Sequence, residues 1–320
     1  MKRLPFRFLA ALLAALNLAT AHAQSADTRP VSLVVPFQAG GQLDAMARFY
    51  ALRLADSLGN PVVVENKPGA AGTLAATFVA RAAADGKTLF LTTGAALTIA
   101  PYLRTSMPYD AKTAFTPLAM IADMPMSLAV RADSPFKTVA DVLQTAKVSP
   151  GGLTVATTGV GAISHLVGEL FAQAAGVKFT FVPYQGIGSI RDLLGGQVPL
   201  IITSSTSLES QVQAGQVRIL ATFSSQRLPS ANGAPTMAEA TGIKGLEVPV
   251  WTGLMAPAKL PPAVAEKLTQ QILATCKDPE TTRQFKEIVA CAGPAEFDRV
   301  IKEDAARWEQ TIRKANLKIE

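Results

Sequence analysis

Short apolar runs alternate along the chain with segments in which apolar residues recur at helical spacing. Residues 31–35 form one such run, and residues 44–58 follow with Met46, Ala47 and Tyr50 on one face. The elements predicted in this first part are strands over residues 31–35, 61–65 and 88–92 and helices over residues 44–58 and 72–84. This alternation predicts an α/β fold with mostly parallel strands.

A second set of apolar runs occupies the middle of the chain and predicts a second domain. The strands predicted there are residues 128–130, 154–157, 179–182, 198–202 and 219–222. Between the second and third of these strands, apolar residues from Ile163 to Ala174 recur at helical spacing, which predicts a helix.

The last quarter of the chain is expected to be extended and then helical. Residues 247–255 predict an extended segment, and three helices are predicted after it, over residues 262–276, 279–289 and 294–314. Helices that follow a βα array suggest that the chain returns to its first domain. We therefore predict one domain from residues 24–123 and 246–320, a second from residues 124–245, and two connections, near residues 123–127 and 245–251, that act as a hinge.

The amino terminus has the pattern of a secretory signal peptide. Residues 1–7 are basic, residues 8–20 are apolar apart from Asn17, and Ala21-His22-Ala23 is a small-residue cleavage site. The apolar core is too short for a membrane anchor, which would have to cross roughly 30 Å of hydrocarbon. We expect cleavage before Gln24, so that residues 1–23 are removed and the protein is periplasmic.

Composition and charge exclude several classes of protein. The chain has 320 residues, of which 49% are hydrophobic and 17% charged, so it can form real cores and is not a disordered chain. Removal of Lys2, Arg3 and Arg7 with the signal peptide lowers the formal charge from +6 to about +3. Without a basic block, the chain gives no indication of a nucleic-acid partner. A small anionic ligand is compatible with this charge.

Two cysteines, Cys276 and Cys291, are the only ones in the chain. In an oxidising compartment they can pair, and the closed loop would stabilise the fold by roughly 3 kcal/mol. The alternative is two free thiols on one helical hairpin. Neither thiol has a plausible partner for catalysis, because His165 is the only histidine outside the signal peptide.

The segment between the first predicted strand and helix is the strongest candidate for a binding site. Its residues Gln38-Ala39-Gly40-Gly41-Gln42-Leu43-Asp44 include glycines that allow close approach of a ligand to the backbone. The first N–H groups of the helix would face that ligand, and a carboxylate or phosphate suits them. Asp44 either orients the ligand or stabilises the start of the helix, and both interpretations remain open.

Two further loops follow predicted strands in the second domain. Residues 157–165 contain Thr158, Gly161, Ser164 and His165 at the start of a helix. His165 either binds an anion or serves as a cap and packs. Residues 182–189 contain Tyr184, whose ring and hydroxyl suit a ligand, although an ordinary strand-to-helix turn explains this loop equally. Ligands of open α/β sheets bind outside the carboxyl ends of strands, where all three loops lie.

The sequence offers no positive evidence for an enzyme. Ser164 and His165 are adjacent, so the imidazole cannot easily act as the base for that hydroxyl, and no GxSxG motif occurs. One histidine and two cysteines leave no cluster with metal-ligand spacing. We therefore expect neither a metal nor another cofactor.

Ordered motifs along the chain resemble those of one known family, the Bug-type periplasmic receptors of tripartite tricarboxylate transporters. The motifs are Val34-Val35-Pro36-Phe37-Gln38-Ala39-Gly40-Gly41 with Asp44 and Arg48, Val64-Glu65-Asn66-Lys67-Pro68-Gly69-Ala70, Asp85-Gly86-Lys87-Thr88-Leu89, Pro108-Tyr109-Asp110, Ser164-His165-Leu166, Val182-Pro183-Tyr184, Asp192-Leu193-Leu194-Gly195-Gly196-Gln197-Val198 and Trp251-Thr252-Gly253. The resemblance covers essentially the whole chain after the signal peptide.

The resemblance implies the two-domain, type II-like α/β fold of periplasmic binding proteins, with a hinge and a ligand cleft between the domains. It implies a receptor, not an enzyme, that captures a small carboxylate and delivers it to membrane permease subunits. The expected ligand-binding residues are Phe37, Ala39, Gly40, Gly41, Gln42, Asp44, Thr93, Thr158, Gly161, Ser164, His165, Tyr184, Thr203 and Ser204. We expect a monomer.

Four positions depart from the usual pattern of the family. Leu43 stands where threonine is common, Gln42 where a smaller residue is common, and Gln185 where lysine is common. Ser204 lies in the stretch 201–205, where an aspartate often takes the place of Thr203. These changes make the expected pocket bulkier and less charged, so we expect an aliphatic or aromatic mono- or dicarboxylate and no amino acid.

Three other functions are consistent with parts of the sequence. The protein could be a ligand sensor for a membrane signalling partner, or a receptor for another small anion or a metal. A secreted hydrolase that uses Ser164 or Asp44 lacks a workable base.

Overall fold

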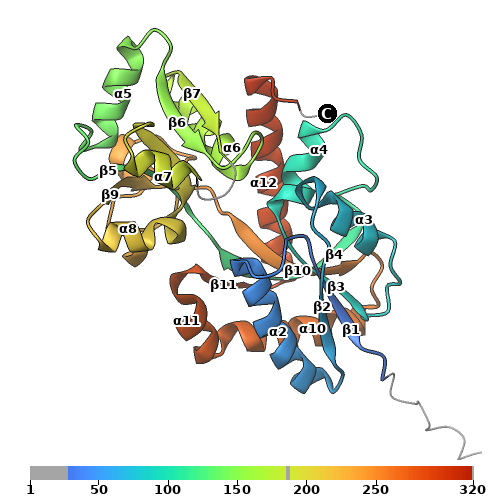
Figure 1. Ribbon diagram of the computed structural model, residues 1–320. Helices are drawn as coiled ribbons and strands as arrows, with labels where there is room; N and C mark the ends of the chain where they lie inside the picture. The colour runs from blue at the N-terminus through green and yellow to red at the C-terminus, as the bar shows by residue number, and fades with distance from the viewer. Residues whose placement is uncertain (1–27, 185–187, 319–320) are drawn as a thin grey trace, which may run out of the picture.

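The structure is a computed structural model that describes residues 28–184 and 188–318 (Figure 1). The expected signal peptide and Gln185 lie outside the described residues. The chain forms two α/β lobes, each built on its own sheet, and Figure 1 shows them one above the other with the longest helix beside both.

The first lobe contains a six-stranded sheet with the order β11-β4-β10-β3-β1-β2. Its strands are β1 (Val31–Val35), β2 (Val62–Asn66), β3 (Thr88–Thr93), β4 (Phe115–Asp123), β10 (Trp251–Pro257) and β11 (Val289–Ala292). Leu33 packs with helices α2 (Gln42–Leu58) and α10 (Pro262–Lys277) on one face, whereas Val34 packs with α3 (Thr73–Ala80) and Phe297 on the other. This alternation is the two-residue period of a strand buried on both faces.

The second lobe contains a five-stranded sheet with the order β7-β6-β8-β5-β9. Its strands are β5 (Met126–Arg131), β6 (Leu153–Thr157), β7 (Phe179–Pro183), β8 (Leu200–Ser204) and β9 (Val217–Thr222). Helices α5 (Val139–Val148), α6 (Ile163–Ala175) and α9 (Met237–Thr241) share a core with one face of the sheet. Helices α7 (Gly188–Leu194) and α8 (Glu209–Gln213) contribute to the core on the other face.

Short helical segments complete the two lobes. They are η1 (Ala70–Gly72), the π-helix η2 (Ala95–Ile99), α4 (Ala100–Leu103), η3 (Ser205–Leu208), η4 (Pro229–Ala231), α11 (Pro279–Phe285) and η5 (Lys286–Ile288). The segment η2 leads directly into α4, so that a single helical rod leaves the carboxyl end of β3.

Both sheets are mixed, so the expectation of mostly parallel strands is wrong. Strand β10 lies between β3 and β4 and runs antiparallel to both, and β11 is antiparallel to β4. In the second sheet, β5 is antiparallel to β8 and β9, whereas β6 is parallel to β7 and β8. Strands β5 and β10 are the first strands after the chain crosses between the lobes, and both run against their neighbours.

The predicted helix over residues 279–289 is also partly wrong. Helix α11 ends at Phe285, and Lys286 has φ 53° and ψ −135°, a backbone conformation that cannot continue the helix. The chain then forms η5 and joins the edge of the first sheet as β11. Strand β4 and helix α5 were not predicted, although both are long.

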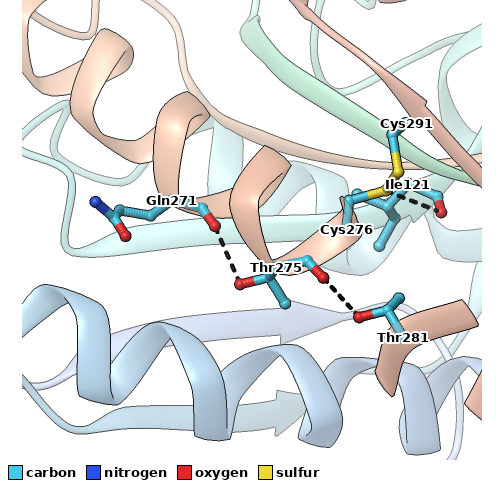
Figure 2. The surroundings of a disulfide bond; sticks show 6 residues. All are labelled: Ile121, Gln271, Thr275, Cys276, Thr281 and Cys291. Atoms are coloured by element: carbon cyan, nitrogen blue, oxygen red, sulfur yellow. Dashed lines mark hydrogen bonds between the residues drawn. A yellow bond between two sulfur atoms is a disulfide. The ribbon is translucent and has the colours of Figure 1, made fainter. Parts of the chain in front are cut away.

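Cys276 and Cys291 form the predicted disulfide, which confirms that expectation over the alternative of two free thiols. Their Cα atoms lie 5.8 Å apart, and the bond joins the end of α10 to β11 (Figure 2). Cys276 is fully buried, and its sulfur lies 3.9 Å from the carbonyl oxygen of Ile121 on β4. The bond therefore closes a loop that carries α11 and η5.

Two connecting segments lie side by side where the chain crosses between the lobes. Met124 follows β4, and its N–H donates to the carbonyl oxygen of Val250 at 3.0 Å. The N–H of Val250 in turn donates to Asp123 Oδ1 at 2.8 Å. The two predicted connections thus form one hydrogen-bonded waist.

The carboxy-terminal helix α12 (Pro294–Ala315) contacts both lobes. Phe297 near its start packs in the first lobe, whereas Trp308 and Ile312 pack in the core of the second. Near its end, the carbonyl oxygen of Thr311 accepts a hydrogen bond from Gln173 on α6 at 3.1 Å. Because α12 belongs to both cores, the predicted division at residues 123 and 246 stays a prediction.

Candidate functional site

A cavity of about 590 Å³ lies between the lobes and takes its walls from both of them. The first lobe contributes Phe37, Gln42, Leu43, Thr93 and Arg104. The second lobe contributes Met126, Thr158, Gly161, Ile163, Ser204 and Ser207. The waist contributes Met124, Pro249 and Val250, and Asp304 and Trp308 come from α12. A ligand in this cavity would contact both lobes at once.

The loop before α2 is held in place by Asp44. One oxygen of its carboxylate accepts the N–H of Gly40 at 2.9 Å, and the other accepts Asn66 Nδ2 at 2.9 Å. Arg48 donates to both oxygens, at 2.9 and 3.2 Å. Gly40 has φ 89°, in the left-handed region that favours glycine. Of the two interpretations of Asp44, the structure shows a carboxylate turned toward its own loop.

These hydrogen bonds also determine the ionisation of Asp44. Its side chain is 4% exposed, and burial by itself would raise its pKa. The donors outweigh burial, so Arg48 first, then the N–H of Gly40 and Asn66, lower the pKa of Asp44 to about 2. The carboxylate therefore stays ionised under all ordinary conditions and keeps its three partners.

The loop before α6 is held by two side chains of that helix. Ser164 is fully buried, and its Oγ accepts the N–H of Thr158 at 2.9 Å. The Nδ1 atom of His165 accepts the N–H of Gly161 at 3.0 Å, and its ring packs edge-on against Phe181. Each side chain thus accepts a hydrogen bond from its own loop, and the role of His165 in binding an anion stays a prediction.

The starts of α2 and α6 face the same cavity. Gln42 and Leu43 form the start of α2, and Ile163 forms the start of α6. Their N-cap residues, Gly41 and Ala162, make no side-chain cap. The first N–H groups of a helix have no partner within it, so both starts can donate to an anion. The site thus has two sets of backbone donors, one from each lobe.

A buried acid lies at the α12 side of the cavity. Asp304 Oδ2 accepts Thr98 Oγ1 at 2.6 Å and Trp251 Nε1 at 3.0 Å. Burial raises the pKa of Asp304, and these donors offset only part of the shift. At the adjacent waist, burial likewise raises the pKa of Asp123 to about 6, and the charge of Asp304 adds to this shift.

The remaining wall of the cavity is largely apolar. Its large apolar side chains are Ile99, Leu103, Met124, Met126, Trp251 and Trp308. Arg104 is the one basic residue and Asp304 the one acidic residue among the described residues that line it. Such a site suits a small ligand with an apolar body and few polar groups.

Apart from Tyr184, the predicted site residues divide into three groups. Phe37, Gln42, Thr93, Thr158, Gly161 and Ser204 line the cavity. The loop residues that lie next to this wall without lining it are Ala39, Gly40, Gly41, Asp44, Ser164 and His165. Thr203 is buried in β8, one position before Ser204. Their role in binding stays a prediction.

Tyr184 is the predicted residue that the structure places elsewhere. It packs at the border of the core formed by Leu193 and Ile201, and Asp192 is a charged neighbour of its hydroxyl. It does not line the described cavity. The role of Tyr184 in binding stays a prediction.

Cavity residues from the waist, from the end of α4 and from α12 were missed by sequence analysis. Met124, Arg104 and Trp308 reach the cavity from segments far apart in the chain. No local motif marks them. Only the helical rod after β3 and the return of α12 bring them together.

The described part of the chain was searched for metal-ligand clusters and for membrane-spanning helices. Within residues 28–184 and 188–318, no three His, Cys, Asp or Glu side chains lie close enough to hold a metal ion. No helix in those ranges has the length and apolar character that a membrane span requires.

The arrangement of this chain is that of a known receptor family. A family model described as the tripartite tricarboxylate transporter family receptor (TctC) matches residues 46–317. The chain belongs to the TctC receptor family. The resemblance to Bug-type receptors that the sequence motifs indicated is therefore confirmed.

Three TctC-like proteins illustrate the similarity. BugT of Bordetella pertussis is 33% identical over 303 residues, which are 92% of this chain and 93% of BugT. The structure of the periplasmic binding protein BugD is 35% identical with a TM-score of 0.74, covering 91% of this chain and 99% of BugD. The structure of R. palustris Rpa4515 with adipate is 34% identical with a TM-score of 0.77 and the same coverage. The two-domain α/β fold of periplasmic binding proteins is thereby confirmed.

Proposed function

We propose that this TctC-family protein is a periplasmic receptor that binds a small carboxylate between its lobes and delivers it to the permease subunits of a tripartite transporter. The observation that carries the proposal is the convergence of two uncapped helix starts, one from each lobe, on one cavity. Backbone donors on both sides suit a carboxylate, and a ligand that contacts both lobes favours their closed arrangement.

The chemistry of the cavity supports an organic acid as the ligand. Apolar side chains such as Met126 and Leu103 suit a hydrocarbon body, and adipate, bound by the related Rpa4515, combines such a body with carboxylates. The cavity suits an aliphatic or aromatic mono- or dicarboxylate better than an inorganic anion, which would leave its apolar wall without contacts.

The further parts of the proposal concern location and partners. The signal-peptide pattern of residues 1–23 supports export and cleavage before Gln24. The family supports a membrane permease as the partner. The receptor would act as a monomer and would bind its ligand without transforming it, since Ser164 and His165 are both engaged in shaping one loop.

Isothermal titration calorimetry of the purified protein tests the proposal. The panel contains linear and aromatic mono- and dicarboxylates, their uncharged amides, a neutral sugar and inorganic phosphate. The proposal predicts saturable binding of at least one carboxylate, no binding of its amide, and recovery of the acid unchanged by mass spectrometry. Binding of the sugar or phosphate alone, or turnover of the acid, would contradict it.

A sensor for a membrane signalling partner is the second candidate. A sensor would bind its ligand in the same cavity, so calorimetry would give the same result for a sensor and for a transport receptor. Uptake of the labelled acid by cells separates the two, because deletion of a transport receptor abolishes uptake and deletion of a sensor changes gene expression while uptake continues.

A further inference from the structure

Two carboxyl groups interact where the waist meets α12. Asp304 lines the ligand cavity from α12, and its side chain is only 2% exposed. Asp123 is the last residue of β4 and precedes Met124, which lines the same cavity. The charge of Asp304 contributes to the raised pKa of Asp123, so the two groups influence each other. The lobes are therefore joined, beside the ligand cavity, at an interacting pair of acids.

The contacts of this pair favour its charged form only in part. Asp304 Oδ2 accepts hydrogen bonds from Thr98 and Trp251. Arg307 forms an ion pair with Oδ1 of the same carboxylate at 3.4 Å. Burial nevertheless raises the pKa of Asp304, and it raises the pKa of Asp123 to about 6. The pair can therefore take up a proton close to neutral pH.

The elements packed against α12 bring few other ionisable groups. Helix η2 and strand β10 contain none. On α6, His165 and Glu169 face each other at 3.7 Å, and on α4, Tyr102 interacts with Glu309 of α12. Arg104 lines the cavity directly after α4. Since Asp304 is the one acid among the described lining residues, its ionisation is the one that a bound anion should affect most.

A bound carboxylate brings a negative charge close to the pair. Carboxylic acids have pKa values of about 4, so the ligand is an anion above about pH 6. The cavity of about 590 Å³ is roughly 10 Å across, and a negative charge at that distance in a protein favours protonation of a carboxyl about tenfold. Protonation of the pair removes the repulsion between its own charge and the ligand.

We propose that the receptor binds a proton together with its carboxylate ligand, and that Asp304 and Asp123 hold this proton as a pair. The inference rests on the proposed function, because the ligand supplies the negative charge. The coupling is reciprocal, so the acid should bind more tightly as the pH falls through the range in which the pair titrates. The proton belongs to the pair, because the two carboxyls titrate together.

Calorimetry in paired buffers tests this inference. The mature protein is titrated with the acid of the panel that binds most tightly, at pH 6, 7, 8 and 9, where the free acid is ionised. Two buffers with different ionisation enthalpies are used at each pH, and the difference in observed heat gives the number of protons taken up. We expect uptake of at least about half a proton per ligand at one of these pH values, and an affinity about three- to tenfold higher at pH 6 than at pH 9.

Variants of the pair identify the group that holds the proton. The double variant Asp123→Asn with Asp304→Asn should take up no proton when it binds the acid, and its affinity should no longer depend on pH. Thr98→Val keeps the shape of the side chain and removes a donor to the ionised Asp304, so it should move the maximum of proton uptake to higher pH. Asp56→Asn, on the exposed side of α2, is the control and should leave the uptake unchanged.

The outcomes separate this inference from the proposed function. Equal heats in both buffers at every pH, or release of protons on binding, would overturn the inference while carboxylate binding remains. Uptake that persists in the double variant would do the same, because it would assign the proton to another group such as His165. Should the double variant not fold, an unshifted maximum in Thr98→Val would overturn the inference. If no acid of the panel binds, the proposed function itself fails.

Discussion

Lys286 on η5 and Glu209 at the start of α8 form an ion pair between the two lobes, with 2.7 Å between Nζ and Oε1. The adjacent Glu287 accepts the N–H of Ser230 at 3.1 Å, again across the lobes. These contacts border a second opening of about 870 Å³, which Gln42 also lines. The tip of the disulfide-closed loop thus connects the lobes beside the ligand cavity.

The first prediction concerns this connection. Lys286→Glu should weaken binding of the best carboxylate about two- to fivefold, because an exposed ion pair makes only a small contribution to the arrangement that holds the ligand. The double variant Lys286→Glu with Glu209→Lys should restore the affinity. Calorimetry at low and high salt measures both, and a double variant no better than the single one would show that the pair does not couple the lobes.

The second prediction concerns the loop that Asp44 holds. Asp44→Ala should weaken carboxylate binding at least tenfold while the protein stays folded, because Gly40 and Asn66 lose a shared acceptor and the start of α2 is no longer fixed. Asp56→Ala on the exposed side of α2 is the matched control. If both variants bind equally well, Asp44 does not shape the site.

The ionisation of Asp44 adds a pH dependence. Its pKa of about 2 lies below the value of an unfolded aspartate, so its contribution to stability is present above about pH 4. That contribution is lost as the pH falls through about 2.

Much of this first loop could be predicted from sequence, because its geometry is local. A strand, two glycines and a helix in direct succession place backbone donors at a sheet edge, whatever the rest of the fold does. The loop of Ser164 and His165 follows the same rule. Tyr184 shows the limit of this rule. It also follows a strand, but its side chain lies beside Asp192 and does not line the described cavity.

The rest of the site depends on contacts between distant segments. Arg104 lies in the cavity because a π-helix and a short α-helix extend from β3, and Trp308 because α12 crosses both lobes. Strand β11 was missed for a related reason. Residues 286–289 are compatible with a helix in isolation. In the structure, the backbone conformation of Lys286 ends the helix, and Val289 pairs with β4 as part of a strand.

The third prediction concerns pH and the waist. Burial raises the pKa of Asp123 from its ordinary 3.8 to about 6, so the protonated form is favoured in the folded state. The associated stability is fully present below about pH 4 and is lost as the pH rises through about 6, by at most about 3 kcal/mol. Asp123→Asn keeps an acceptor for Val250 and should raise the melting temperature at pH 8 but not at pH 4.

Thermal unfolding by circular dichroism measures this difference. The control is Asp56→Asn, an exposed carboxylate whose replacement should shift the melting temperature little at either pH. Equal shifts of the melting temperature for Asp123→Asn at pH 4 and pH 8 would mean that burial does not raise the pKa of Asp123.

The fourth prediction concerns the disulfide. Replacement of both Cys276 and Cys291 by alanine should lower the free energy of unfolding by roughly 3 kcal/mol, the chain-entropy value for a loop of this length. Urea unfolding monitored by tryptophan fluorescence measures the change. A reducing agent should lower the stability of the wild type by a similar amount and leave the double variant unaffected. An equal response of both proteins would contradict the assignment.

Small-angle X-ray scattering tests most directly whether the two lobes close on an organic acid. The protein is measured alone, with a saturating concentration of the carboxylate that binds most tightly in calorimetry, and with the amide of that acid. A bending waist and a ligand held from both sides predict a smaller radius of gyration with the acid only. Identical scattering curves with and without an acid that binds would contradict the account.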